Sequence, residues 1–116
     1  MHSRDPHIVS VRHDAEFWCR RGADLMHKGD YRNSITFFDK AITIYPYLVD
    51  ALENKAKCLD ELGQYRQAIE CYNEAIQIDP INSELWYNKS ISYLKLGQIK
   101  EAEVCAKTAI DLAMGR

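Results

Sequence analysis

The sequence lacks most of the features that mark membrane, secreted, metal-binding or nucleic-acid-binding proteins. No apolar run approaches the ~20 residues that a membrane span requires, and residues 1–14 have no apolar segment of the secretory-signal kind. The four cysteines, Cys19, Cys58, Cys71 and Cys105, are widely separated, so there is no Cys-x-x-Cys pair for zinc or redox chemistry. The net charge of −2 differs from the basic excess that nucleic-acid-binding domains usually carry. We therefore expect a cytoplasmic protein with free cysteines.

The sequence also lacks the residue patterns of common catalytic sites. It has no glycine-rich phosphate-binding loop, and no spacing suggests a Ser-His-Asp or Cys-His set. His2, His7 and His13 fall near the N-terminus, where solvated imidazoles are expected. We predict that the protein is not an enzyme, and we predict neither a cofactor nor a metal site.

What the sequence does contain is an internal repeat with a period of about 34 residues. GDYRNSITFFDKAITIYP aligns without gaps on GQYRQAIECYNEAIQIDP, and a third copy begins GQIKEAEVCAKTAIDLAM. Their first glycines, Gly29, Gly63 and Gly97, follow one another at equal intervals. A related segment precedes each glycine. The predicted organisation is therefore a flexible N-terminal tail followed by three repeats, with the bounds 1–14, 15–48, 49–82 and 83–116.

Each repeat is predicted to form two helices. An Ala-Ile pair recurs in the second half of each repeat, with apolar neighbours three and four residues earlier, which is a helical spacing and not the alternation of a strand. Glycine falls between the halves, and Pro46 and Pro80 fall in the links to the next repeat. The fold class is therefore all-α. The first helices are expected at 15–28, 49–62 and 83–96, and the second at 31–44, 65–78 and 99–113.

Period and spacing together resemble the tetratricopeptide repeat (TPR) family, whose pattern W-x2-L-G-x2-Y…A-x3-F…P recurs with this same period. The resemblance covers residues 15–114. It implies a right-handed superhelical solenoid whose first helices line a concave groove that binds peptides or partner helices, with no activity and no cofactor of its own. The matching residues are Trp18, Gly22, Phe38, Ala41 and Pro46; Ala68, Tyr72, Ala75 and Pro80; and Trp86, Tyr93, Ala102 and Ala109.

The sequence departs from this pattern at two positions. The seventh residue of each repeat, usually leucine, is Arg21, Lys55 or Lys89, and Met114 stands where a proline would lead into another repeat. Long basic side chains can pack their aliphatic stems while the charge stays at the surface. An ion pair or a contact with a partner is the alternative.

The resemblance places the candidate site on the side of the first helices that lies opposite their apolar side. Charged faces of this kind are in many proteins only solvated surface, and that alternative stays open. The candidate residues of this peptide-binding groove are Glu16, Cys19, Arg20, Ala23 and His27; Asp50, Glu53, Asn54, Lys57 and Glu61; and Glu84, Tyr87, Asn88, Ile91 and Lys95.

The predicted function is that of a protein-interaction scaffold or adaptor, without a nucleic-acid or membrane partner. The middle repeat carries seven acidic and three basic residues, so we expect a partner segment with Lys or Arg at its centre. Relatives that grip a chaperone's C-terminal carboxylate do so with converging Lys, Asn and Arg. The corresponding positions here hold Cys19, Ala23, Asn54, Glu84 and Asn88, so we predict that the groove is not such a carboxylate clamp.

Two other functions remain open from the sequence. The chain can be a regulatory TPR segment of a larger multidomain enzyme or signalling protein. It can also be a homo-oligomer that assembles through an uncapped C-terminal edge, since 99–113 carries Val104, Ile110 and Leu112 and terminal repeats normally need a polar cap. The sequence names neither the partner nor the pathway, and it does not say whether the repeats belong to a longer array.

Overall fold

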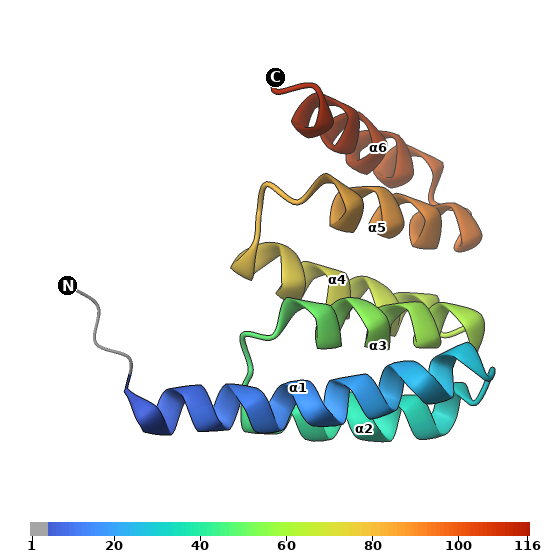
Figure 1. Cartoon of the computed structure of the whole chain (residues 1–116). Coiled ribbons are helices and arrows are strands. Elements are labelled where there is room, and N and C mark those ends of the chain that lie inside the picture. Colours follow the sequence, from blue (N-terminus) through green and yellow to red (C-terminus); the bar gives the residue numbers. More distant parts are fainter. Residues whose placement is uncertain (1–4) are drawn as a thin grey trace.

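A computed structural model describes residues 5–116, and in that range it contains six α-helices and no strand. They form three antiparallel hairpins that stack in chain order, from α1 and α2 at one end to α5 and α6 at the other (Figure 1). The prediction of an all-α solenoid is confirmed. The helices are α1 (Pro6–His27), α2 (Tyr31–Ile44), α3 (Val49–Glu61), α4 (Tyr65–Ile78), α5 (Ser83–Lys95) and α6 (Ile99–Ala113).

The turn inside each hairpin depends on its glycine. Gly29, Gly63 and Gly97 have φ angles of +81°, +79° and +78°, in the left-handed region that glycine enters without steric cost. The Gly29 N–H donates to the Met26 carbonyl at 3.0 Å, and the next N–H donates to the Leu25 carbonyl at 2.9 Å. The same pair of bonds follows α3 and α5. These bonds satisfy carbonyls at the helix end, so each hairpin turns at the same point of its repeat.

The apolar core runs from hairpin to hairpin through a slab that measures 45 × 39 × 18 Å, which is about two helices thick. Each of its two clusters joins three consecutive helices, so no hairpin buries its apolar side alone. The first comprises Ala15, Cys19, Phe38, Ala41, Leu48, Ala51 and Cys58. The second comprises Leu52, Ala56, Leu59, Ala68, Cys71, Tyr72, Ala75, Ile76 and Leu85.

The basic residue at the seventh position makes a different contact in each repeat, and the ion-pair alternative occurs in the middle one. In the middle repeat, the Lys55 Nζ atom lies 2.6 Å from Asp39 Oδ1 of the preceding helix α2, which forms an ion pair. In the first repeat, the Arg21 guanidinium instead lies over the Phe17 and Phe37 rings, at 5.8 and 5.7 Å from their centroids. The Lys89 ammonium lies 5.1 Å from the centroid of a tryptophan ring in the third repeat.

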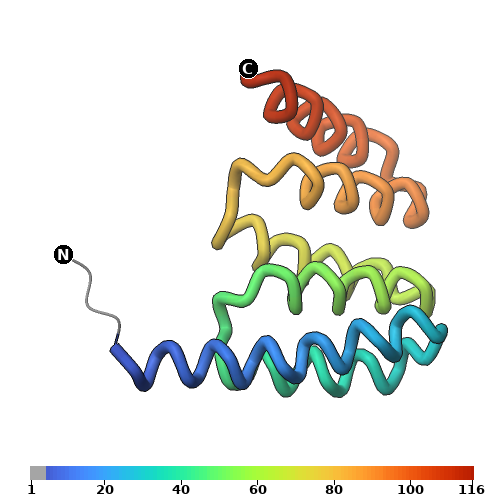
Figure 2. The backbone as a smooth tube through the Cα atoms, viewed as in Figure 1, coloured from blue at the N-terminus to red at the C-terminus, as the bar shows by residue number. Residues whose placement is uncertain are grey.

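The prediction of a flexible tail over 1–14 is wrong for residues 6–14, which are the first turns of α1 (Figure 2). Asp5 caps the helix by accepting a hydrogen bond from the His7 N–H at 2.9 Å, and Pro6 occupies the first helical position, where its missing N–H costs nothing. The Arg12 guanidinium lies 5.7 Å from the centroid of the Tyr45 ring. The prediction also covers residues 1–4, which lie outside the residues that the structure describes.

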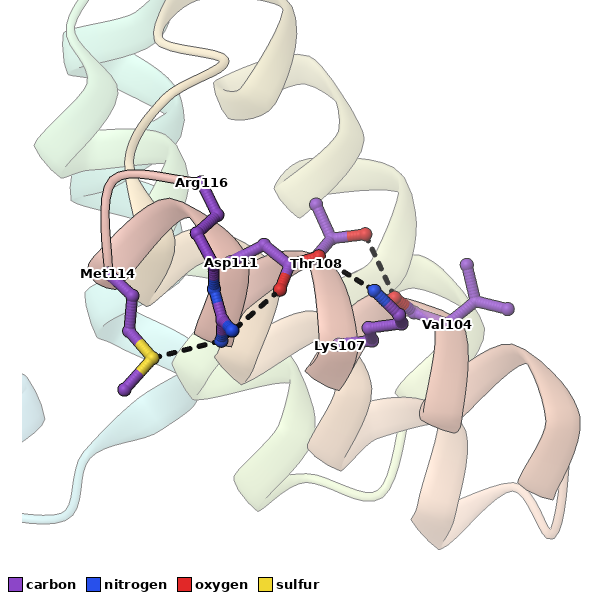
Figure 3. A network of polar contacts seen from close by, with 6 residues as sticks. All are labelled: Val104, Lys107, Thr108, Asp111, Met114 and Arg116. Carbon is purple, nitrogen blue, oxygen red and sulfur yellow. Dashed lines mark hydrogen bonds and ion pairs between the residues drawn. The ribbon is translucent and has the colours of Figure 1, made fainter.

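The outer side of α6 mixes exposed apolar residues with a polar network. The Lys107 ammonium donates to Asp111 at 2.9 Å, and the Arg116 guanidinium lies 3.5 Å from the same carboxylate and donates to the Met114 sulfur (Figure 3). Ile110 stays exposed on the same helix. Within the described residues, no helix has the length and apolarity that a bilayer crossing would demand.

The close approach of α1 and α2 can be tested at Gly22. A Cβ atom there would lie 2.7 Å from Cε1 of Phe38, whose side chain is fully buried. Overpacking typically costs ~1–3 kcal/mol, whereas alanine gains only ~1 kcal/mol of helix propensity over glycine. Gly22→Ala should therefore lower the free energy of unfolding by about 1 kcal/mol in urea denaturation. In a Phe38→Leu background the loss should vanish, and an equal loss in both backgrounds would contradict this account.

Candidate peptide-binding groove

One face of the molecule, formed by α1, α3 and α5, carries two depressions, and we call it the groove face. The first depression lies between α1 and α3 and has a volume of about 340 Å³. It brings together six residues that the sequence predicted and one, Leu48, that it did not. The lining residues are Glu16, Cys19, Arg20, Ala23, Leu48, Asp50 and Asn54.

The second depression lies between α3 and α5 and has a volume of about 170 Å³. Tyr72 of α4, which the sequence predicted only as a residue of the repeat pattern, reaches it from the layer beneath. Lys57, Glu61, Asn88, Ile91 and Lys95 were all predicted site residues. The complete lining is Lys57, Asp60, Glu61, Tyr72, Asn88, Ile91 and Lys95.

Glu53 lies on α3 beside the residues that line the second depression, and it connects α3 with α5. Its Oε2 atom accepts a hydrogen bond from Asn88 Nδ2 at 3.2 Å and lies 3.9 Å from the Lys57 ammonium. Burial raises the Glu53 pKa to about 7, helped by a hydrogen bond to the Glu84 carboxyl and by the charges of Glu84 and Asp50, against the opposing effect of Lys57. The groove face therefore holds a carboxyl that changes charge near neutral pH.

The sequence placed Cys19 and Glu53 on an exposed face, and this is wrong, since each is only 8% exposed. Cys19 belongs to the core cluster that joins α1, α2 and α3, and Glu53 is covered where α5 packs beside α3. Burial, followed by the negative charges of Asp50 and Glu16, raises the Cys19 pKa to about 11. The thiol is therefore protonated at neutral pH and is a poor nucleophile.

A second polar link between α3 and α5 involves a residue that the sequence analysis missed. The buried Ser92 hydroxyl lies 2.8 and 2.9 Å from the two carboxylate oxygens of Asp60 and donates to that carboxylate. Burial raises the Asp60 pKa, while the Ser92 hydrogen bond and Lys95 oppose the shift. The sequence did contain a signal for this link. Ser92 lies on the apolar side of a predicted helix, and a hydroxyl that is buried there needs a hydrogen-bond partner.

Four predicted site residues, His27, Glu53, Glu84 and Tyr87, line neither depression. Glu84 nevertheless adjoins Glu53, and the exposed Tyr87 belongs to the same α5 helix as Ile91. Within residues 5–116, no three His, Cys, Asp or Glu side chains are grouped so that they could hold a metal ion. The arrangement offers a surface for contact, with carboxylates in the middle and apolar side chains toward α5.

A stack of helical hairpins with a depressed face formed by the first helix of each hairpin defines a helical-repeat protein. Three family models, each described as a tetratricopeptide repeat, match residues 15–48, 49–82 and 71–104. The chain belongs to the tetratricopeptide repeat family. The match to residues 71–104 does not coincide with the predicted third repeat, 83–116, so the bounds of that repeat stay a prediction.

The chain is also similar to individual proteins. It is 38% identical over 45 residues to an uncharacterized protein of Methanocaldococcus jannaschii, a stretch that is 39% of this chain and 52% of the relative. The chain thus spans about half the length of that curated relative.

Three solved structures show the same fold at low sequence identity. The second TPR of Spaghetti (RPAP3), bound to the HSP90 peptide SRMEEVD, has a TM-score of 0.84 at 20% identity, over 89% of this chain and 95% of that one. A MamA structure has a TM-score of 0.85 at 23% identity, over 87% and 59%. The Sgt2 TPR domain from Aspergillus fumigatus has a TM-score of 0.82 at 22% identity, over 86% and 66%.

The buried carboxyl of Glu53 predicts a pH-dependent stability. Its folded-state pKa is raised to about 7 from an ordinary value of 4.5, so the protein binds the proton more tightly when folded. The resulting stabilisation is full below pH ~4.5 and is lost as the pH rises through ~7. Glu53→Gln should therefore raise the melting temperature more at pH 8 than at pH 5. The exposed Glu61→Gln is the control, and an equal gain at both pH values for Glu53→Gln would refute the shift.

Proposed function

We propose that the chain is a protein-interaction scaffold that holds a peptide or a helix of a partner protein along the groove face. The observation that carries this proposal is the pair of depressions on one face, with volumes of about 340 and 170 Å³, to which α1, α3 and α5 all contribute. Membership of the tetratricopeptide repeat family supports it, because stacked repeats create extended surfaces of the kind that bind other proteins.

We further propose that the bound segment has Lys or Arg at its centre. Asp50, Glu61 and Glu84 are exposed carboxylates of α3 and α5, whereas the neighbouring Lys57 ammonium lies beside the buried Glu53. The linings of the two depressions hold carboxylates in slight excess: Glu16, Asp50, Asp60 and Glu61 against Arg20, Lys57 and Lys95. Such an excess favours a positively charged ligand segment. Ile91 lines the second depression and Tyr87 is exposed on the same helix, so apolar side chains of the ligand would bind toward α5.

The same charges argue against an acidic C-terminal peptide as the ligand. Cys19 and Ala23 contribute no cation to the first depression, and Asn88 is already hydrogen-bonded to Glu53. Glu84 lies beside that pair and would repel a carboxylate. We therefore propose that the groove is not a carboxylate clamp.

Free thiols support the cytoplasmic setting that the sequence predicts. Cys19, Cys58, Cys71 and Cys105 are all buried and unpaired, and burial raises the pKa of each thiol. A reducing compartment keeps such cysteines in this state.

Peptide display against the intact chain tests the ligand chemistry. Selection from a random 12-residue library should enrich sequences with Lys or Arg beside apolar residues. The selected peptides should bind an Asp50→Lys/Glu61→Lys variant more weakly by at least about 1 kcal/mol, which is roughly five-fold, and their affinity should fall with added salt. The control is Glu70→Lys/Glu74→Lys, in which the same charge change is made on exposed residues of α4. Peptides that bind all three proteins equally would refute the groove as the site.

The exclusion of a carboxylate clamp is tested with SRMEEVD, the peptide bound in the Spaghetti (RPAP3) structure. Calorimetry with this peptide should show no saturable binding to the native chain up to ~1 mM, because two acidic residues, Asp50 and Glu84, would face an anion. Glu84→Lys is the informative variant, since it removes the repulsion and adds a cation. Micromolar binding to the native chain would contradict the proposal.

A further inference from the structure

A second surface lies at the end of the stack formed by α1 and α2, away from the groove face. Phe17, Trp18, Arg21, Phe37 and Lys40 make up what we call the aromatic edge. The Phe17 and Trp18 rings meet edge to face with centroids 5.1 Å apart, and Trp18 stacks on Phe37 at 5.6 Å. The Lys40 ammonium lies 4.0 Å from the centroid of the Trp18 ring, and Arg21 lies over the two phenylalanine rings.

The positions of Phe17 and Phe37 are buried in the other two repeats, although Trp86, Lys89 and Cys105 still line a depression of about 380 Å³ in the third repeat. Phe17 is 45% exposed, but Ala51 and Leu85, which occupy the same position in the second and third repeats, have no exposed surface. Phe37 is half-buried, whereas Cys71 and Cys105 at the same repeat position are buried. In those repeats the first helix packs against the second helix of the preceding repeat, α3 against α2 and α5 against α4. An exposed aromatic group at such a position indicates a contact surface.

The path of α1 shows why no such helix covers the aromatic edge. Links of four residues, 45–48 and 79–82, turn the chain from α2 into α3 and from α4 into α5. At the corresponding point of the first repeat, residues 6–14 continue α1 as a straight helix that extends past the start of α3 (Figure 2). The chain from residue 5 onward therefore leaves the edge open.

The contact of α2 with α3 indicates what kind of helix the aromatic edge would bind. In that contact, Ile35 and Ile42 pack against the core of the middle repeat, and Asp39 between them pairs with Lys55 at 2.6 Å. Arg21 occupies the position of Lys55 in the first repeat, and among the described residues no carboxylate lies within ion-pair distance of it. A helix that binds the aromatic edge in the same way would carry a carboxylate opposite Arg21. An apolar residue would lie about one turn before that carboxylate and another about one turn after it.

A second copy of the chain does not supply this pattern. In the third repeat, Lys107 stands at the position of Asp39 and Glu103 at the position of Ile35. Stacking α6 of one copy on α1 of another in the register of the internal contacts would place Lys107 against Arg21. Like charges in contact disfavour such an arrangement.

We propose that the aromatic edge is a second docking surface, which binds an amphipathic helix of another protein with an acidic residue opposite Arg21 and apolar residues four positions before and three positions after it. This surface is independent of the groove face. It would allow the chain to hold two partners at once.

A helical peptide made from α2 tests this proposal. The probe is a hydrocarbon-stapled peptide of residues 31–44 with Phe37→Ala and Phe38→Ala, which keeps Ile35, Asp39 and Ile42 on one side. Calorimetry with the native chain should show saturable binding. Arg21→Glu should weaken it at least about ten-fold, and a probe carrying Asp39→Lys should bind Arg21→Glu better than it binds the native chain.

Arg20→Glu is the matched control, because Arg20 is the adjacent arginine and lines the first depression of the groove face. It should change the affinity less than about two-fold, and circular dichroism should show that both variants are folded. Absence of saturable binding, or an equal loss in both variants, would overturn the proposal. So would a dimer of the native chain in sedimentation that Arg21→Glu dissociates, since a second copy would then be the occupant.

Discussion

The packing of each second helix against the first helix of the next repeat is the interaction on which the rest of the structure depends. Ile35 and Ile42 of α2 reach into the cluster formed by α3, α4 and α5, and Ile76 of α4 belongs to that cluster. Each repeat thus completes the core of its neighbour. The groove face exists because this contact sets α1, α3 and α5 side by side.

The sequence predicts this packing well because its determinants are local and repeat. Glycine at one fixed position of every repeat is needed for the left-handed turn after α1, α3 and α5, so the glycines alone locate the hairpins. The start of α1 was predictable too, since Asp5 followed by Pro6 is a helix-start signal. It was missed because residues 6–14 fall outside the repeat, and periodicity carries no information about a segment that occurs once.

The candidate site was less predictable because burial on the groove face depends on the distance between helices of different repeats. A helical wheel places Glu53 correctly on the side away from the α3 core, but it contains no information about α5, which supplies Asn88 and Glu84 around that carboxyl. A buried carboxyl is costly unless it is hydrogen-bonded or neutral. Glu53 is hydrogen-bonded, and its pKa of about 7 leaves it partly protonated. A positive charge beside Glu53 would favour its ionised form and lower its pKa.

The two ends of the stack differ in chemistry, and this difference bears on what the protein can assemble with. At the α6 end, the position that holds Ile35 and Ile69 in the first two repeats holds Glu103, and Lys107 pairs with Asp111. At the α1 end, Phe17 stands at the position of Ala51 and Leu85, and Phe37 stands at the position of Cys71 and Cys105. In a head-to-tail stack with the register of the internal contacts, Lys107 would face Arg21, and Glu103 would stand where the α2–α3 contact has the apolar Ile35. Both replacements disfavour that stack. The exposed apolar surface of α1 and α2 is therefore better matched by a different protein than by another copy of this chain.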